Sequence, residues 1–287
     1  MEWTWRGIPI LTGPENAVAS ASGLPAFGNP VLFPAVGRTW DFTAPGAPEL
    51  GWYTLAGSPQ RLRMPVHGLA GRAAWHQRHQ DQAAGGPLEL GYEWSPDTDE
   101  RRECYPFDVL LQLDFRLDAL SLEIAARVVN RGERAAPFAL GFHPYFRLAD
   151  PAKARVRLAC GEELALDPAL GVPAGSRAVD GGVCLTLAPD EPCDRVFASI
   201  GTPREALIEH AGPAHDLRVS FDAGFEQLVI YRRANANFIC TEPWTRGLGG
   251  FGTLREPGWE QSASLNILPP GGTWQARLRY EILPRGQ

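Results

Sequence analysis

Three short segments of the sequence bring titratable side chains together with aromatic residues, and they are where this chain could do chemistry. A histidine or a carboxylate can donate or accept a proton near neutral pH, which makes these side chains the usual general acids and bases. An aromatic ring beside them provides an apolar face on which the C–H surface of a sugar can stack. The three segments are residues 64–75, which contain His67; residues 141–146, which contain His143; and residues 237–245, which contain Glu242 and Trp244.

Each of the three titratable side chains also has a plainer structural interpretation. His143 is flanked by aromatic residues and could be a core histidine that is satisfied by a backbone carbonyl. Glu242 precedes a proline and could be a surface carboxylate at a turn. His67 precedes a glycine and could likewise belong to a turn. The local sequence leaves these alternatives open.

No pattern in the sequence predicts a metal site. The pair His76-x-x-His79 has a spacing that could bind a metal, but its immediate neighbours are glutamine and arginine. The five cysteines, at positions 104, 160, 184, 193 and 240, are odd in number and include no Cys-x-x-Cys pair. Neither a thiolate metal site nor a disulfide framework is therefore expected.

The elements that must position these side chains are predicted to be β-strands. Apolar and polar residues alternate over residues 111–117, 120–128 and 274–282, which gives each segment one buried and one solvated face. Shorter strand candidates are residues 217–221, 227–231 and 237–241. The 31 glycines and 26 prolines are scattered through the chain and leave few windows for an uninterrupted helix. The sequence therefore predicts an all-β fold, a large sandwich or barrel, formed by a single domain over residues 1–287.

The overall composition argues against several classes of partner. A formal net charge of −6 disfavours binding to nucleic acid or to an anionic membrane surface, so we expect neither as a partner. Residues 1–25 lack a basic start followed by a long apolar run, and no stretch of about 18 apolar residues could span a bilayer. We therefore expect a cytoplasmic protein with reduced thiols.

Taken together, the segments resemble the aldose 1-epimerase (galactose mutarotase-like) family. The resemblance rests on His-Gly-x-Ala at residues 67–70, Gly-Phe-His-Pro-Tyr-Phe at residues 141–146 and Thr-Glu-Pro-Trp-Thr at residues 241–245, in the order and spacing of that family. Two weaker matches are the Leu-Phe-Pro and Gly-Arg elements within residues 30–38 and the Pro-Pro-Gly-Gly turn within residues 268–272.

This resemblance implies a large antiparallel β-sandwich of the galactose mutarotase type, with the sugar bound on a concave sheet face. By motif position, it implies His143 as the general acid and Glu242 as the general base. The side chains that it implies for substrate binding are His67, Asp194, Arg38, Arg72 and Trp244.

The predicted reaction is the interconversion of the α- and β-anomers of a free aldose by acid/base ring opening. A base takes the proton of the C1 hydroxyl while an acid protonates the ring oxygen, and the chemistry requires no metal and no redox cofactor. With Glu242 as a carboxylate and His143 as an imidazolium in the free enzyme, kcat/KM is expected to have a bell-shaped pH profile.

Two alternatives remain open. A hexose-6-phosphate 1-epimerase would need positive charge from Arg38, Arg72 and Arg246 at one place, although relatives of that branch often have an arginine where this chain has Gly71. A non-catalytic carbohydrate-binding domain would keep the aromatic and hydroxyl-binding groups without needing an acid–base pair. In every case the expected partner is a small sugar, and the chain is expected to be a monomer or a homodimer.

Overall fold

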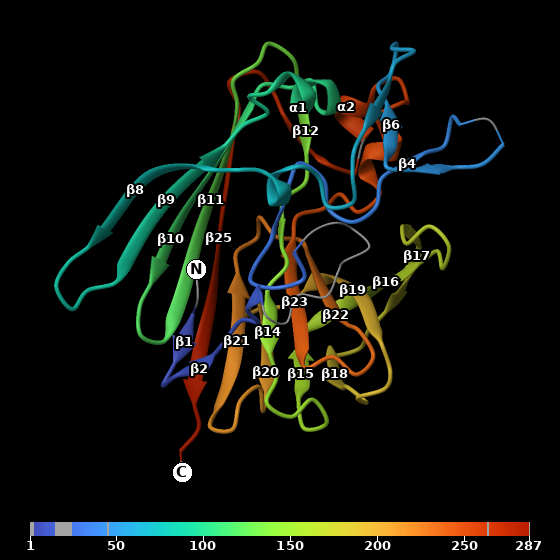
Figure 1. Cartoon of the computed structure of the whole chain (residues 1–287). Coiled ribbons are helices and arrows are strands. Elements are labelled where there is room, and N and C mark those ends of the chain that lie inside the picture. Colours follow the sequence, from blue (N-terminus) through green and yellow to red (C-terminus); the bar gives the residue numbers. More distant parts are fainter. Residues whose placement is uncertain (1–2, 15–24, 45, 263, 287) are drawn as a thin grey trace.

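Two large antiparallel sheets make up most of this chain. The computed structural model describes residues 3–14, 25–44, 46–262 and 264–286 (Figure 1). The two sheets have nine and eight strands, and every strand pairing within them is antiparallel. The predicted all-β sandwich is therefore confirmed.

The nine-stranded sheet contains the three segments with the clearest alternation in the sequence. Its strands, in spatial order, are β18 (Val183–Thr186), β15 (Arg155–Leu158), β20 (Glu205–Glu209), β21 (His215–Phe221), β25 (Thr273–Pro284), β11 (Ser121–Asn130), β10 (Val109–Leu117), β9 (Leu88–Trp94) and β8 (His76–Gln82). The apolar residues of β11 are buried and lie on one face, including Leu122, Ile124 and Val128. That burial is what period-two alternation predicts for a sheet with one face against a core.

The eight-stranded sheet carries the candidate site. Its strands, in spatial order, are β17 (Pro173–Ala178), β16 (Cys160–Leu166), β19 (Cys193–Ile200), β22 (Gln227–Arg232), β23 (Phe238–Trp244), β13 (Gly141–Phe142) and β3 (Val31–Leu32), and β14 (Tyr145–Arg147) also pairs with β23. All seven residues of β23 are buried, on both faces of the strand. A strand buried on both faces does not alternate between apolar and polar residues, so the sequence pattern predicts β23 less clearly than the other strands.

The remaining elements are short. The small strand pairs are β1 (Thr4–Trp5) with β2 (Ile8–Pro9), β4 (Trp40–Asp41) with β5 (Glu49–Leu50), β6 (Trp52–Thr54) with β7 (Arg61–Arg63), and β12 (Ala136–Phe138) with β24 (Asn266–Leu268). The helices of the described chain are α1 (Asp99–Cys104), α2 (Trp259–Ser262) and two 3₁₀ turns, Ala70–Arg72 and Gly250–Thr253. Within these described residues, no helix has both the length and the apolar character that crossing a membrane requires.

The core lies between the two sheets, and this decides which side chains are left for a site. Phe146 of β14 meets Tyr280 of β25 edge to face, with their ring centroids 5.2 Å apart. On β23, successive side chains point to opposite faces, so Ile239 packs into the core cluster while Glu242 belongs to the other face. That other face of the eight-stranded sheet forms the floor of a cavity.

Candidate active site

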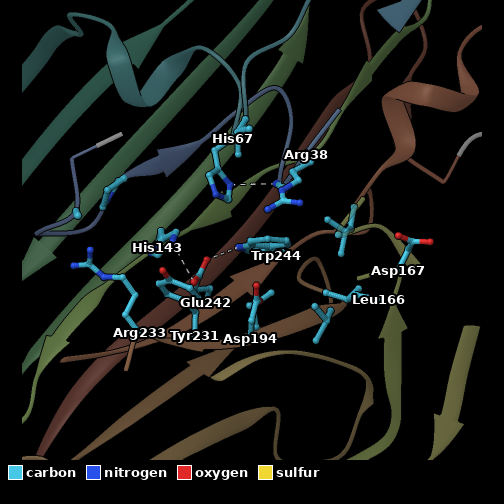
Figure 2. Close-up of a pocket in the computed structure, with 18 of the residues that line it drawn as sticks. Arg38, His67, His143, Leu166, Asp167, Asp194, Tyr231, Arg233, Glu242 and Trp244 are labelled. Atoms are coloured by element: carbon cyan, nitrogen blue, oxygen red, sulfur yellow. Dashed lines mark hydrogen bonds and ion pairs between the residues drawn. The ribbon is translucent and has the colours of Figure 1, made fainter. Parts of the chain in front are cut away.

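The cavity lies over the strands of the eight-stranded sheet and has a volume of about 660 Å³. This lies in the usual size range of small-molecule sites, roughly 300–1,000 Å³. Residues from widely separated parts of the chain line it (Figure 2). The lining polar and aromatic side chains are Arg38, His67, His143, Tyr145, Asp167, Asp194, Tyr231, Arg233, Glu242 and Trp244.

Strand register places His143 against Glu242. β13 pairs Gly141 with Trp244, and β14 pairs Tyr145 with Cys240. His143 lies midway between Gly141 and Tyr145, so it falls opposite Glu242. Directly opposed residues share a face of a sheet, and both of these side chains point into the cavity. The imidazole Nε2 of His143 lies 3.3 Å from Oε1 of Glu242. A histidine and a carboxylate about 100 residues apart in sequence thus form a contact pair.

The Glu242 carboxylate is held in place from two sides. Its Oε2 accepts a hydrogen bond of 3.1 Å from Nε1 of Trp244, and its Oε1 faces His143. The residue is only 1% exposed. Burial raises the pKa of Glu242 well above its usual value, the nearby Asp194 charge raises it further, and the indole hydrogen bond acts in the opposite direction.

The His143 imidazole is buried among aromatic rings. It stacks on Tyr145 with centroids 4.6 Å apart and meets Tyr231 edge to face at 5.8 Å. Burial lowers the pKa of His143 to about 3, because the apolar surroundings disfavour its charged form. This direction runs against the imidazolium expected from the sequence for the free protein. Together with the raised pKa of Glu242, it favours a neutral imidazole beside a carboxylic acid.

His67 completes a row of rings across the cavity. Its ring lies edge to face with His143 at 5.6 Å and with Trp244 at 5.9 Å. The backbone N–H of Gly37 donates to Nδ1 of His67 over 3.1 Å. Because Nδ1 accepts this bond, the neutral ring carries its proton on Nε2, which makes that nitrogen a hydrogen-bond donor. Burial lowers the pKa of His67 well below its usual value, and the neighbouring His143 lowers it further, so this neutral form is favoured.

Asp194 and Arg38 supply charges of opposite sign to the lining of the cavity. Asp194 lies on β19, opposite Tyr231 of β22, and lines the cavity. Burial raises the pKa of Asp194, and the Arg38 guanidinium acts against that rise. Nη1 of Arg38 also donates to the carbonyl of Ala169 over 3.3 Å. A carboxylate and a guanidinium in this arrangement can accept from and donate to sugar hydroxyls.

The family can be assigned by comparing the chain with known proteins. The family model described as aldose 1-epimerase matches residues 49–281. The chain belongs to the aldose 1-epimerase family. No curated protein matches it in sequence.

Solved structures of other proteins share the fold of this chain. The Slr1438 protein from Synechocystis sp. PCC 6803 superposes with a TM-score of 0.78 at 25% identity, over 99% of this chain and 88% of that one. A galactose mutarotase-like protein from Clostridium acetobutylicum gives a TM-score of 0.75 at 17% identity, over 97% and 86% of the two chains. The galactose 1-epimerase from Lactobacillus acidophilus gives 0.68 at 17% identity, over 98% and 86%. At these identities the likeness concerns the fold.

Six of the seven site residues predicted from the sequence of this aldose 1-epimerase family member line one cavity. They are Arg38, His67, His143, Asp194, Glu242 and Trp244. The seventh, Arg72, is not among the lining residues, and its predicted contact with the substrate stays a prediction. Its Nη1 and Nη2 donate to the carbonyls of Gly68 and Val66 over 2.7 and 2.9 Å, so its guanidinium is used to brace the turn that presents His67.

Of the three arginines that the hexose-6-phosphate alternative would use, Arg38, Arg72 and Arg246, only Arg38 lines the cavity. Arg246 pairs with Glu226 over 3.0 Å and lies outside the lining of the cavity. The second arginine of the cavity is Arg233, which sequence reasoning missed. It follows directly after β22 and lies 5.5 Å over the ring of Phe238. No local pattern distinguishes it from Arg232, which is buried behind the sheet.

Tyr145, Tyr231 and the turn at residues 166–171 also line the cavity without having been predicted to do so. Tyr145 lies inside the motif around His143, and Tyr231 ends a segment that was predicted to be a strand. Both could have been found by extending the strand alternation toward the site. No sequence pattern predicted the turn at residues 166–171 as part of the site, because only tertiary contacts bring it to the edge of the cavity.

One group of cavity-floor residues has the donor types of a metal site. His143, Cys240 and Glu242 are all buried, and one ligand atom from each lies within 4.8 Å of the others. The sequence predicted no metal site here, since Cys240 and Glu242 lie on β23 while His143 lies in the distant link between β13 and β14.

Proposed function

We propose that this protein is an aldose 1-epimerase that interconverts the α- and β-anomers of an aldose. The observation that carries the proposal is the contact between His143 and Glu242, 3.3 Å apart on the floor of a cavity lined with hydroxyl-binding groups. Ring opening needs one proton donor and one proton acceptor at neighbouring oxygens of the sugar. A pair that shares a single proton supplies one of each.

The proposed reaction uses one group of the pair as proton donor and the other as proton acceptor. With the shared proton on Nε2 of His143, the Glu242 carboxylate takes the proton of the C1 hydroxyl and the imidazolium gives its proton to the ring oxygen. The bond between C1 and the ring oxygen breaks, and C1 becomes the carbonyl carbon of the open aldehyde. After rotation about the C1–C2 bond, the freed hydroxyl attacks the other face of C1 and returns its proton to His143. Glu242 then gives its proton to the former carbonyl oxygen.

Burial of both groups disfavours the charged arrangement of the pair. A bound sugar changes this balance, since its hydroxyls donate to the carboxylate and accept from the imidazolium. We expect the proton to move to His143 when the substrate binds. His67, Asp194 and Arg38 would hold the remaining hydroxyls, and Trp244 would offer its ring face to the sugar.

A mutarotation panel tests the proposal. Freshly dissolved α-anomers of hexoses, pentoses and hexose 6-phosphates are followed by polarimetry or NMR, with and without the protein. The proposal predicts faster equilibration of at least one of these sugars. A carbohydrate-binding domain without activity would bind a sugar and leave its rate at the spontaneous value, which would refute the proposal.

A hexose-6-phosphate 1-epimerase is a second candidate, favoured by the position of two arginines. Arg38 and Arg233 both line the cavity, and Arg233 makes no ion pair with any residue that the structure describes. Figure 2 shows the two arginines on different sides of the Glu242 carboxylate. A phosphate group at one end of the sugar could therefore meet Arg233 while the hydroxyls meet Arg38. In the panel, this candidate predicts faster turnover of the 6-phosphates than of the free hexoses.

A further inference from the structure

The donor atoms of His143, Cys240 and Glu242 form a group that the proposed reaction does not use in full. Cys240 lies two residues before Glu242 on β23, so the two side chains point to the same face of the sheet. The three ligand atoms lie within 4.8 Å of one another, and all three residues are buried. Cys240 has no part in moving protons to or from the sugar, and it is not among the residues that line the cavity.

The spacing of two of these atoms already suits a tetrahedral ion. Zinc binds a histidine nitrogen at about 2.0–2.1 Å and a carboxylate oxygen at about 2.0–2.2 Å, so two such ligands of one tetrahedron lie roughly 3.3–3.5 Å apart. Nε2 of His143 and Oε1 of Glu242 are 3.3 Å apart. A thiolate at about 2.3 Å from the same ion would lie roughly 3.6 Å from the nitrogen. Because the three ligand atoms already lie within 4.8 Å of one another, binding would require the sulfur to approach by no more than about 1.2 Å.

The charges of the three ligands balance a divalent ion. A deprotonated Cys240 and a deprotonated Glu242 carry two negative charges, and His143 binds as a neutral imidazole. The complex with a divalent cation is therefore neutral, which avoids leaving a net charge in a buried site. Two protons leave to the solvent on binding: the thiol proton, and the single proton shared by the His143–Glu242 pair.

The surroundings also hold the ligands in place. Trp244 donates to Oε2 of Glu242, which leaves Oε1 directed at His143, and Tyr145 stacks on the imidazole. Contacts of this kind, one layer outside the ligands, orient them toward a metal. Cys240 itself packs against Tyr145 and Phe238 in a small apolar cluster. The cavity side of the trio stays open for a water molecule or a sugar hydroxyl as fourth ligand.

We propose that His143, Cys240 and Glu242 bind a thiophilic divalent cation, with Zn²⁺ as the preferred ion, and that the bound ion inhibits the enzyme. Thiolate and imidazole ligands select zinc over the hard cations Mg²⁺ and Ca²⁺. Inhibition rests on the proposed function, because the ion would occupy the two atoms that move the protons. Binding of the ion does not depend on that function and is tested separately.

Binding of Co²⁺ to a site with a thiolate ligand can be followed by optical absorption. The full-length protein is treated with a chelator and titrated with Co²⁺, and the absorption of a thiolate-to-cobalt charge-transfer band is recorded; Zn²⁺ is then added to displace the cobalt. We expect one Co²⁺ per chain with this band, and its loss on addition of Zn²⁺. The variant Cys240→Ala is expected to lose the band and to bind Zn²⁺ at least about 100-fold more weakly. The matched control is Cys184→Ser, whose cysteine is exposed on β18 and should leave the band unchanged.

The outcomes separate the metal site from the enzymatic activity. A wild-type protein without the band, or a Cys240→Ala variant that keeps it, overturns the proposed metal site whatever the activity. If Cys240→Ala fails to fold, Cys240→Ser replaces it in the same titration. Inhibition is read as the ratio of mutarotation rates with Zn²⁺ and with chelator for each variant. Equal inhibition of the wild type and the Cys240 variant would also overturn the proposal, and a metal band without mutarotation would refute only the proposed function.

Discussion

At the scale of single residues, the central feature is the 3.3 Å contact between a buried histidine and a buried glutamate, His143 and Glu242. Burial pushes the pKa of Glu242 up and that of His143 down, and each shift favours the uncharged form. Both directions favour an arrangement in which the pair carries one proton, with one group able to donate and the other able to accept.

The first prediction concerns the charge of His143. Because burial lowers the pKa of His143 to about 3, its ring should stay neutral as the pH falls through the ordinary range of histidine. The acid limb of kcat/KM should accordingly lie well below pH 6.5, after correction for the spontaneous reaction. Ring ¹⁵N chemical shifts measured from neutral pH to about pH 5 check the charge directly. A ring that titrates near pH 6.5 in the free protein would contradict the prediction.

The second prediction concerns the two proton-transfer groups separately. His143→Asn and Glu242→Gln each remove one group and keep a polar side chain of similar size. Each should lower kcat by about 10²- to 10⁴-fold, the usual contribution of a positioned acid or base. Circular dichroism and thermal melting serve to confirm that the variants are folded. If one variant keeps wild-type mutarotation of every active sugar, its residue is not part of the mechanism.

At the scale of secondary-structure elements, β23 is the strand that organises the site. It lies between β22 and the short strands β13 and β14, and its register with them places Glu242 opposite His143. The close approach of β13 depends on Gly141. A Cβ at this position would lie 2.5 Å from Cδ1 and 2.9 Å from Nε1 of Trp244. The glycine therefore makes room for the indole that holds the Glu242 carboxylate.

The third prediction tests that packing. Gly141→Ala should displace the Trp244 ring, weaken its hydrogen bond to Glu242 and lower kcat/KM. Overpacking of a buried site costs about 1–3 kcal/mol of unfolding free energy, which a denaturant titration can measure. The matched control is Gly175→Ala on the exposed strand β17, where a Cβ meets no atom within 4 Å. Equal effects of the two substitutions on kcat/KM would show that the contact with Trp244 is not what matters.

At the scale of the whole molecule, the site is closed by segments that lie far apart in the sequence. The stretch around Arg38 and Trp40 meets the turn at residues 166–171, and both border the cavity. Nε1 of Trp40 donates to the carbonyl of Leu170 over 2.8 Å, across 130 positions of sequence. This bond and the one from Arg38 to Ala169 hold the rim on one side of the cavity.

The fourth prediction concerns this rim. Trp40→Phe removes the donor to Leu170 and keeps most of the ring, so it should cost about 0.5–1.5 kcal/mol of unfolding free energy. KM is expected to rise while kcat stays near the wild-type value, because the rim holds the substrate without touching the proton-transfer pair. Steady-state kinetics with a thermal melt of the same sample measures both effects. A fall in kcat at unchanged KM would place the effect of Trp40 in the chemical step instead.

The strands of this protein were largely predictable from the sequence, and so were most of the site residues. The alternation that predicted β10, β11 and β25 is a local property, because each residue faces either core or solvent whatever its distant neighbours are. The motifs around His67, His143 and Glu242 indicated the family, and six of the seven predicted residues line the cavity. The positions of the arginines were not predictable in this way. The Arg72 guanidinium donates hydrogen bonds to the carbonyls of its own turn, and no sequence pattern distinguishes Arg233 from its buried neighbour.

Only the tertiary structure decided how those residues work together. The sequence determined that a histidine and a glutamate with these neighbours were present, but their 3.3 Å contact depends on the register of β13 against β23. Their charge state depends on burial, which is produced by the whole sandwich and is invisible in a local motif. The same holds for Cys240, which comes near His143 only because two strands pair. Proton transfer and metal binding both depend on distances of a few ångströms, and those distances are set by packing across the sheet.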